Sequence, residues 1–401
     1  MIHRLAGAPG PQRFDAAVVG RGTVGMAAAL ALARAGLSVA IVGPAARVST
    51  PAHDDDWDSR VYALSPGSRG LLSQLRVWDG LPAQRVQPVY DMRVAGASDL
   101  SFSAYESGTE ALAWIVENRA LLSALDPALR FSGVASHEAS VDAMQVDADA
   151  ARLTLSDGSL LECRLVVGAD GAQSRVREQA RLPASIMPYP QAAVVANFRC
   201  GRPHLDTAYQ WFGAHGVLAM LPLPADAQRR GGASMVWSAP LALAEELAAL
   251  SPETLAARVA QATGGLLGEL RTITPAQRYP LQLMTLRHVT AARVALVGDA
   301  AHMMHPLAGQ GMNAGFGDVA ELVRVLAARE PGRDPGDPLL MRRYARGRRE
   351  AVVAMQTITD GLQKLFSPGV PGPVAMARDL GWSLLERSPW AKRRLIAQAM
   401  Q

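Results

Sequence analysis

The sequence contains little of several features that mark particular protein classes. It has two cysteines in 401 residues, Cys163 and Cys200, so we do not expect a disulfide framework. So few cysteines suit a protein of the reducing cytoplasm. Neither cysteine has neighbours at a metal-ligand spacing, and no metal is expected. Lys and Arg number 40 against 36 Asp and Glu, an excess too small to indicate nucleic-acid binding.

Long apolar runs are also absent. Residues 24–43 come closest, with Arg34 as the one charge among them. Gly36 and the β-rich run beyond it indicate a helix followed by a strand rather than a membrane span. Residues 1–13 are polar and contain no apolar signal region. The apolar fraction of 49% permits a large core, and the length predicts about two or three domains.

A dinucleotide fingerprint lies near the N-terminus. An apolar strand at 16–19 is followed by a glycine pattern, then by a helix ending at Gly36 and a second strand at 38–42. The first glycine permits a tight turn, the second admits a pyrophosphate, and the third lets the helix pack on the strand. The alternative is a tight turn without nucleotide. The expected cofactor contacts are Gly20, Gly22, Thr23, Val24 and Gly25.

One expected residue is missing from this unit. The second strand normally ends in Asp or Glu, which holds the adenosine ribose, but Gly43 occupies the position here. Either a loop residue such as Arg47 contacts the ribose, or the nucleotide is held more weakly. A Gly43→Glu substitution is expected to restore the contact and raise affinity.

Residues 293–318 hold the most informative motif. A buried strand at 294–297 runs into Gly298-Asp299, and a Pro- and Gly-rich loop then enters a helix near Asn313. Such loops bring backbone N–H groups close to a ligand, and a helix start adds partial positive charge. A carboxylate followed by this loop suits a cofactor that has hydroxyls and an electron-rich carbonyl. Together with the fingerprint, the motif indicates FAD.

Three motifs together resemble the class A flavoprotein monooxygenases, which have the p-hydroxybenzoate hydroxylase fold. They are Gly20-x-Gly22-x-x-Gly25, Gly168-Ala-Asp170-Gly171 and Gly298-Asp299. Residues 58–65, 305–318 and 384–400 are further similar to the UbiH-type hydroxylases of ubiquinone biosynthesis. The resemblance covers the chain from Asp15 onward, and Gly43 is its departure from the family pattern.

The resemblance implies roles for individual residues. Asp299 would bind the ribityl hydroxyls, and Asp170 would line a groove shared by FAD and nicotinamide. Arg60 and Arg119 would lie near the flavin or its phosphates, with an ordinary surface ion pair as the alternative for each. The remaining implied cofactor contacts, at the turn and at the pyrimidine edge of the flavin, are Gly298, Gly309, Gln310, Gly311, Met312 and Asn313.

The resemblance also implies an architecture. The expected fold is α/β, with a Rossmann-like FAD-binding domain, an interleaved β-sheet substrate domain and a C-terminal helical region. The FAD-binding domain would comprise residues 1–80, 115–185 and 285–360. The substrate domain would comprise residues 81–114 and 186–284, and the helical region 361–401. Residues 216–222 are the most apolar part of the expected wall over the flavin.

The implied reaction is hydroxylation of the aromatic ring of a polyprenylated phenol in ubiquinone biosynthesis. NAD(P)H would reduce FAD transiently, and O2 would form a hydroperoxide at the flavin C4a carbon that hydroxylates the ring. The sequence indicates no catalytic residue, in keeping with chemistry carried by the cofactor. Two alternatives remain: the same reaction on a soluble aromatic, and a scaffold without catalysis.

Two further features bear on ligands and partners. His302 and His305 are three residues apart, but their neighbours offer no other ligands, so structural roles are favoured over a metal site. Residues 374–388 and 389–400 predict short amphipathic helices with a basic group at 392–394. These could lie on the inner face of the cell membrane or cover a packed surface. Assembly into a biosynthetic complex or a homo-oligomer is left open.

Overall fold

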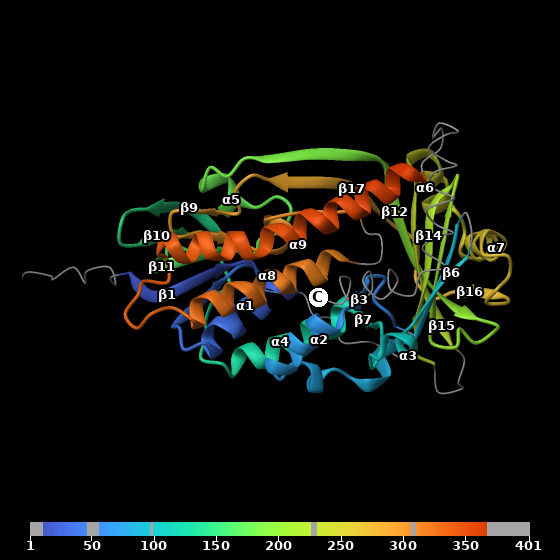
Figure 1. Cartoon of the computed structure of the whole chain (residues 1–401), viewed down its shortest axis with the longest axis horizontal. Helices are drawn as coiled ribbons and strands as arrows, with labels where there is room; N and C mark the ends of the chain where they lie inside the picture. The colour runs from blue at the N-terminus through green and yellow to red at the C-terminus, as the bar shows by residue number, and fades with distance from the viewer. Residues whose placement is uncertain (1–10, 46–55, 97–98, 226–230, 306–309, 367–401) are drawn as a thin grey trace, which may run out of the picture.

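Two large sheets and their helices make up the molecule (Figure 1). The structure is a computed structural model that describes residues 11–45, 56–96, 99–225, 231–305 and 310–366. Mixed α/β architecture of this kind confirms the expected fold class. In Figure 1 the first sheet lies on the left and the second on the right. Strands β12 (Ala184–Cys200) and β17 (Gln277–Leu286) and helix α9 (Pro338–Leu365) run along the molecule between them.

The first sheet has a parallel centre. Its strands follow the order β18-β19-β11-β1-β2-β8, and β1 pairs in parallel with both β2 and β11. An antiparallel hairpin, β9–β10, extends it from β11. The strands are β1 (Gln12–Val19), β2 (Val39–Val42), β8 (Ala135–His137), β9 (Val141–Val146), β10 (Ala151–Leu155), β11 (Leu160–Gly168), β18 (Thr290–Ala291) and β19 (Val294–Leu296).

Alternate residues of β1 face two different layers, because side chains of a strand point to opposite faces. Ala16 and Val18 pack into a core with the long helices, whereas Ala17 and Val19 pack on the β9–β10 side with α5. This strand is therefore buried on both faces. The helices are α1 (Thr23–Arg34), α2 (Pro66–Gln74), α4 (Asn118–Arg130), α5 (Arg175–Gln179), α8 (Gln310–Ala327) and α9 (Pro338–Leu365).

The second sheet follows the order β16-β12-β15-β14-β13-β5-β6, with β17 paired to β12. Helices α6 (Leu241–Ala249) and α7 (Pro252–Ala262) cover its outer face (Figure 1). The strands are β5 (Asp91–Ala95), β6 (Leu100–Ser103), β12 (Ala184–Cys200), β13 (Thr207–Gly213), β14 (Gly216–Leu223), β15 (Gly232–Pro240), β16 (Leu270–Thr272) and β17 (Gln277–Leu286).

A small sheet links the two large ones. It consists of β3 (Val61–Leu64), β7 (Ala113–Glu117) and β4 (Val86–Val89), in the order β3-β7-β4. Short helical turns complete the described chain: α3 (Ala104–Ser107), η1 (Trp78–Gly80), η2 (Ala83–Arg85) and η3 (Gly298–Ala300). The small sheet carries residues from both sides of the expected boundaries at 80 and 115. The division into domains therefore stays a proposal.

Strand β12 is 17 residues long and also pairs with β17. The expected boundary at 361 falls inside α9, which continues to Leu365. The amphipathic helices expected beyond residue 373 lie outside the described residues.

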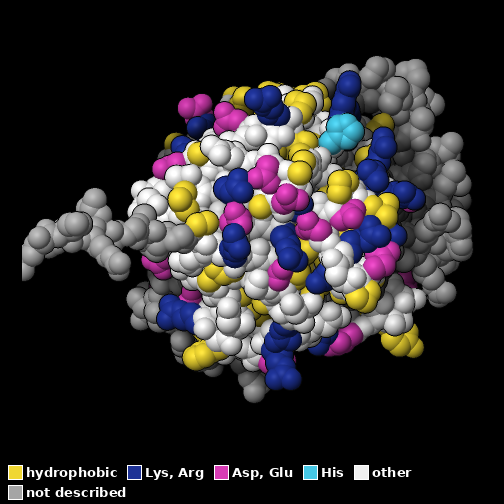
Figure 2. Space-filling model, turned by 90° about the vertical axis from the view of Figure 1, so that its left-hand side faces the viewer, with side chains coloured by type: hydrophobic (Ala, Val, Ile, Leu, Met, Phe, Trp, Pro, Cys, Tyr) yellow, Lys and Arg dark blue, Asp and Glu magenta, His cyan; other side chains and the backbone are white. Residues whose placement is uncertain are grey.

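The surface carries charge of both signs. On the face shown in Figure 2, acidic and basic side chains of the described residues are interspersed rather than segregated. In the described ranges, no helix combines the length and the apolar character that a membrane crossing requires.

Helix α9 is fastened to the first sheet by Tyr344. Its hydroxyl donates to the Leu296 carbonyl oxygen at 2.7 Å, and the side chain is fully buried. Tyr344→Phe should lower the free energy of unfolding by about 1–2 kcal/mol, because the carbonyl loses a buried partner. Tyr105→Phe is the matched control, since Tyr105 is exposed. Urea unfolding of both variants without cofactor checks this, and equal losses would contradict it.

Candidate functional site

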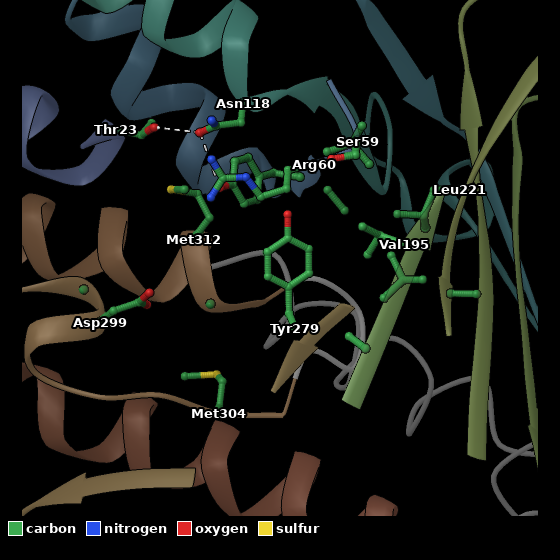
Figure 3. Close-up of a pocket in the computed structure, with 18 of the residues that line it drawn as sticks. Thr23, Ser59, Arg60, Asn118, Val195, Leu221, Tyr279, Asp299, Met304 and Met312 are labelled. Carbon is green, nitrogen blue, oxygen red and sulfur yellow. Dashed lines mark hydrogen bonds between the residues drawn. The ribbon is translucent and has the colours of Figure 1, made fainter. Parts of the chain in front are cut away.

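A cavity of about 650 Å³ lies where the two large sheets face each other. The glycine loop after β1, the turn after β19 and the start of α8 form one side of it (Figure 3). Strands of the second sheet form the other side. Of the residues expected at the cofactor, the cavity lining includes Gly22, Thr23, Val24, Arg60, Gly298, Asp299, Gly311 and Met312.

The glycine loop is shaped by close backbone packing. A Cβ at Gly25 would collide with the carbonyl oxygen of Gly20, and one at Gly20 with that of Ala169. A Cβ at Gly22 would meet nothing within 4 Å. Gly22 is also the N-cap residue of α1 and has no side chain to accept a hydrogen bond from the first N–H groups of the helix, which are left for a ligand. Space and donors for a pyrophosphate are thus present at this residue.

Asp299 stands at the turn that follows β19 and lines the cavity (Figure 3). Its surface can be reached from the cavity, yet the surrounding protein desolvates the carboxyl group and raises its pKa. The charge of His302 opposes this rise, and that of Asp318 adds to it. A carboxylate in such a position gains most from ligand hydroxyls, which would restore the hydrogen bonds lost with water.

A cluster of buried charged side chains fixes the turn at Gly298 and Asp299. Asp318 of α8 accepts hydrogen bonds from the Gly298 amide at 2.9 Å and from Arg348 of α9 at 2.7 Å. His302 Nε2 lies 2.7 Å from the same carboxylate. Burial raises the pKa of Asp318, but the neighbouring His302 and Arg348 charges outweigh it and the pKa is lowered. Both ends of the Gly298–Asp299 turn are therefore fixed by an ionised side chain.

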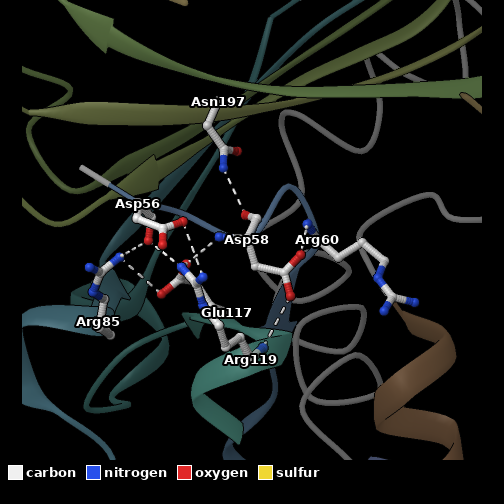
Figure 4. Close-up of polar contacts among 7 residues, drawn as sticks. All are labelled: Asp56, Asp58, Arg60, Arg85, Glu117, Arg119 and Asn197. Carbon is white, nitrogen blue, oxygen red and sulfur yellow. Dashed lines mark hydrogen bonds and ion pairs between the residues drawn. The ribbon is translucent and has the colours of Figure 1, made fainter. Parts of the chain in front are cut away.

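The two candidate arginines have different surroundings. Arg60 is exposed to the cavity, and its guanidinium forms no ion pair with the described residues (Figure 4). Arg119 is ion-paired with Asp56 at 3.1 Å and lies 3.7 Å from Glu117. It lines a smaller cavity of about 430 Å³ that adjoins the first. Of the two, Arg60 has the charge available for a ligand.

Arg60 is held by a polar network that crosses between sheets (Figure 4). The Asp58 amide donates to Glu117, the Asp58 carboxylate accepts from the Arg60 and Arg119 amides, and Asn197 donates to the Asp58 carbonyl. Burial raises the pKa of Glu117, and the nearby Arg85 and Arg119 charges counter the rise. Through Asn197, strand β12 of the second sheet thus helps to position Asp58 and, with it, Arg60 on the cofactor side of the cavity.

Other expected residues have structural partners. Asp170 accepts hydrogen bonds from the Ser174 hydroxyl and from the Val176 amide at the start of α5, whose N-cap residue is Ser174. Asp170 itself is not in the cavity lining, whereas its neighbours Ala169 and Gly171 are. Asn313 is buried: its amide oxygen accepts from Ser65 and Ser68, and its amide nitrogen donates to the Ala63 carbonyl. Gln310 begins α8, and Gly309 lies outside the described residues.

The two histidines also engage protein groups. His302 contacts Asp318, and His305 Nε2 lies 3.1 Å from the Gln191 side chain. Burial lowers the pKa of His305 to about 4. Within the described ranges, no group of three or more His, Cys, Asp or Glu side chains could hold a metal ion.

Sequence reasoning missed part of the lining. Tyr62, Gln210, Ser238, Tyr279 and Met304 all face the cavity. Gln210, Ser238 and Tyr279 lie in strands without a motif, and only the alternation of those strands could have indicated which side chains point inward. Burial raises the pKa of Tyr62 to about 12, so its hydroxyl stays protonated. In Figure 3 the Tyr279 hydroxyl points into the cavity toward Arg60.

Comparison with known proteins decides the family. A family model described as an FAD binding domain matches residues 13–359. A ubiquinone hydroxylase, UbiL, of Rhodospirillum rubrum is 37% identical, over 96% of this chain and 89% of the relative. The chain belongs to this FAD-dependent hydroxylase family.

Further matches agree. The 3-demethoxyubiquinol 3-hydroxylase of Escherichia coli is 32% identical, over 97% of this chain and 99% of its own. The solved p-nitrophenol 4-monooxygenase of Pseudomonas putida superposes with a TM-score of 0.75 at 18% identity, over 97% of this chain and 99% of that one. At this low identity, the match to p-nitrophenol 4-monooxygenase shows a shared fold alone. FAD is thus the cofactor, and the open space at Gly22 and the desolvated Asp299 carboxyl fit it.

Two residues of the glycine loop of this hydroxylase, Gly22 and Gly25, should respond differently to substitution by alanine. Gly22→Ala has room in the protein, and its extended backbone suits alanine, but the methyl would occupy the side proposed for the pyrophosphate. We expect near-normal stability and at least about tenfold weaker FAD binding. Gly25→Ala should cost about 1–3 kcal/mol of stability through overpacking. Thermal unfolding without cofactor and FAD titration check the pair. Gly22→Ala with unchanged FAD affinity would contradict the assignment.

Proposed function

We propose that this hydroxylase acts on the aromatic ring of a polyprenylated phenol in ubiquinone biosynthesis, with NAD(P)H as electron donor. The observation that carries the proposal is one cavity with two unlike sides. Polar loops with Asp299 and Arg60 lie on one side, and an almost wholly apolar sheet face lies on the other. An enclosed ring with a hydrocarbon chain suits such a sheet face, whereas a charged or small soluble aromatic would leave it exposed to water.

Strand alternation builds this apolar face. In β14, Val217, Ala219 and Leu221 line the cavity, while Leu218 and Met220 pack in the core beneath α6 and α7. The same period places Ala193 and Val195 of β12, Ala208 of β13, Val236 of β15 and Leu281 of β17 in the lining. Most of these side chains are Ala or Val, with Leu221 and Leu281 beside them, and together they form the apolar floor of the cavity.

Few polar groups interrupt the floor. Gln210 of β13 and Ser238 of β15 are buried side chains in this lining, on strands separated by β14, and Tyr279 lies on β17. A small number of placed polar groups on an apolar surface orients a ligand without hydrating it. We propose that one or more of them bind the phenolic oxygen and turn the ring toward the cofactor.

The names of the relatives indicate the substrate class. UbiL is a ubiquinone hydroxylase, and the Escherichia coli relative is a 3-demethoxyubiquinol 3-hydroxylase. Both act on rings of the ubiquinone type, and both match this chain over nearly its whole length. Because such a substrate is lipid-soluble, we include in the proposal that the enzyme works at the inner face of the membrane or in a biosynthetic complex.

Bound FAD supplies the oxygen-activating chemistry. In the proposed arrangement the residue 20–25 loop would hold the pyrophosphate and Asp299 the ribityl hydroxyls. The backbone at Gly311 and Met312 would lie by the flavin ring, with α8 beginning at Gln310. The apolar floor would exclude water from the reacting atoms, which favours ring hydroxylation over loss of hydrogen peroxide.

The substrate assignment is tested with purified protein, FAD and NAD(P)H. We expect hydroxylated product from a polyprenylated phenol, with lower efficiency as the prenyl chain is shortened. Equal kcat/KM for an unprenylated phenol would instead favour a soluble aromatic. FAD binding without substrate-stimulated NAD(P)H oxidation would favour a scaffold. Quinone intermediates that accumulate in a strain lacking this protein would identify the ring position.

Gly311→Val tests the flavin side of the cavity. A Cβ at Gly311 would meet nothing within 4 Å, so the variant should fold normally while its side chain extends into the cavity. We expect retained FAD and NAD(P)H oxidation that yields mainly hydrogen peroxide, with product reduced at least about tenfold. Peroxide and product are measured together against NAD(P)H consumed. Wild-type coupling would show that this loop does not face the flavin.

A further inference from the structure

The end of β2 has no room for the side chain that the fold usually places there. Gly43 has φ +157°, and a Cβ on it would lie 3.1 Å from the Arg21 amide nitrogen and 3.2 Å from Arg21 Cγ. The Gly43 amide itself donates to the His137 carbonyl of β8. Arg21, the second residue of the glycine loop, therefore lies over the position of the missing carboxylate.

Arg21 is anchored at its far end. Its Nη1 donates to Ser136 at 2.8 Å and to Glu138 at 3.4 Å, and its Nη2 lies 3.9 Å from Asp126. Ser136 belongs to β8, which pairs with β2 through Ile41. The side chain thus crosses the end of β2 and reaches the next strand.

The Nε donor of Arg21 is left without a hydrogen-bond partner in the described part of the chain. The side chain is 7% exposed. A buried donor without a partner costs free energy, and a bound ligand can supply the acceptor. Arg21 also belongs to the lining of the large cavity, beside Gly22. The nearest part of a dinucleotide in this fold is the adenosine ribose, which sits at the end of the second strand.

We propose that Arg21 replaces the missing ribose carboxylate, its Nε donating to a hydroxyl oxygen of the adenosine ribose of FAD. A hydroxyl both donates and accepts hydrogen bonds, so a guanidinium can serve where a carboxylate usually does. Glu138 and Asp126 hold the guanidinium in place and offset its charge. The proposal depends on FAD binding alone and not on the substrate.

This arrangement reverses the sequence-based expectation for Gly43→Glu. The new Cβ would press on the Arg21 backbone and Cγ, and the glutamate would displace the anchored side chain. We now expect weaker FAD binding in this variant, measured by the same titration. Tighter binding would show that the ribose contact was vacant, and it would overturn the role of Arg21.

The direct test compares two ligands: FAD, and an FAD analogue whose adenosine ribose lacks both hydroxyls. Arg21→Met should raise the Kd for FAD at least about tenfold, the usual scale for a hydrogen bond to a charged group. Wild type and Arg21→Met should bind the analogue equally well. Arg130→Met is the matched control, because Arg130 also pairs with Asp126 but is largely exposed.

Other outcomes overturn the proposal. Equal weakening for both ligands would mean that Arg21 contacts a phosphate or only shapes the loop, and unchanged FAD affinity would remove any role. If Arg21→Met does not fold, as judged by thermal unfolding without cofactor, Arg21→Lys decides. Lysine keeps the charge near Glu138 but lacks Nε, so it should no longer distinguish FAD from the analogue. Retained discrimination in Arg21→Lys would refute the contact.

Discussion

The buried carboxylate of Asp318 is the constraint on which the rest of the site depends. It joins α8, where it resides, to the turn after β19 through the Gly298 amide and to α9 through Arg348. An ionised group without water is tolerated only when such partners surround it, and loss of one partner typically costs about 3–5 kcal/mol. The turn that presents Asp299 to the cavity therefore cannot shift without exposing this charge. Rigidity at the cofactor side follows from electrostatics rather than from packing alone.

The second sheet obeys a different constraint. Its outer face must pack beneath α6 and α7, so alternate residues of β12, β14 and β15 are committed to that core. The residues between them face the cavity, and most of them are Ala or Val. The apolar floor is thus the second face of an ordinary two-layer packing. Asn197 joins this sheet to the Asp58 segment, so the floor and the charged side hold a fixed relation.

The sequence predicts the cofactor half better than the substrate half. Strand, glycine turn and helix at 12–34 follow from local rules, because the close approach of Gly25 to Gly20 admits no other residue type. The confirmed fold class and family also rest on these motifs. The inward face of β13, β15 and β17 could not be assigned, since alternation gives two faces and only the partner layer decides which is buried. The position of Asn313 shows the same limit: the motif is local, but its partners lie about 250 residues away.

Arg60 and Arg119 show how tertiary partners decide what residue type cannot. The sequence suggests the same role for both arginines, and the backbone amides of both donate to the Asp58 carboxylate. Glu117 at the end of β7 and Asp56 neutralise Arg119, whereas Asp58 binds only the backbone of Arg60 and leaves its guanidinium toward the cavity. A charge-assisted donor has most effect where no protein carboxylate competes for it. The network thus pairs its carboxylates with Arg119. The positive charge of Arg60 stays on the polar side of the cavity, the side that also carries Asp299, where an anionic cofactor group would meet it.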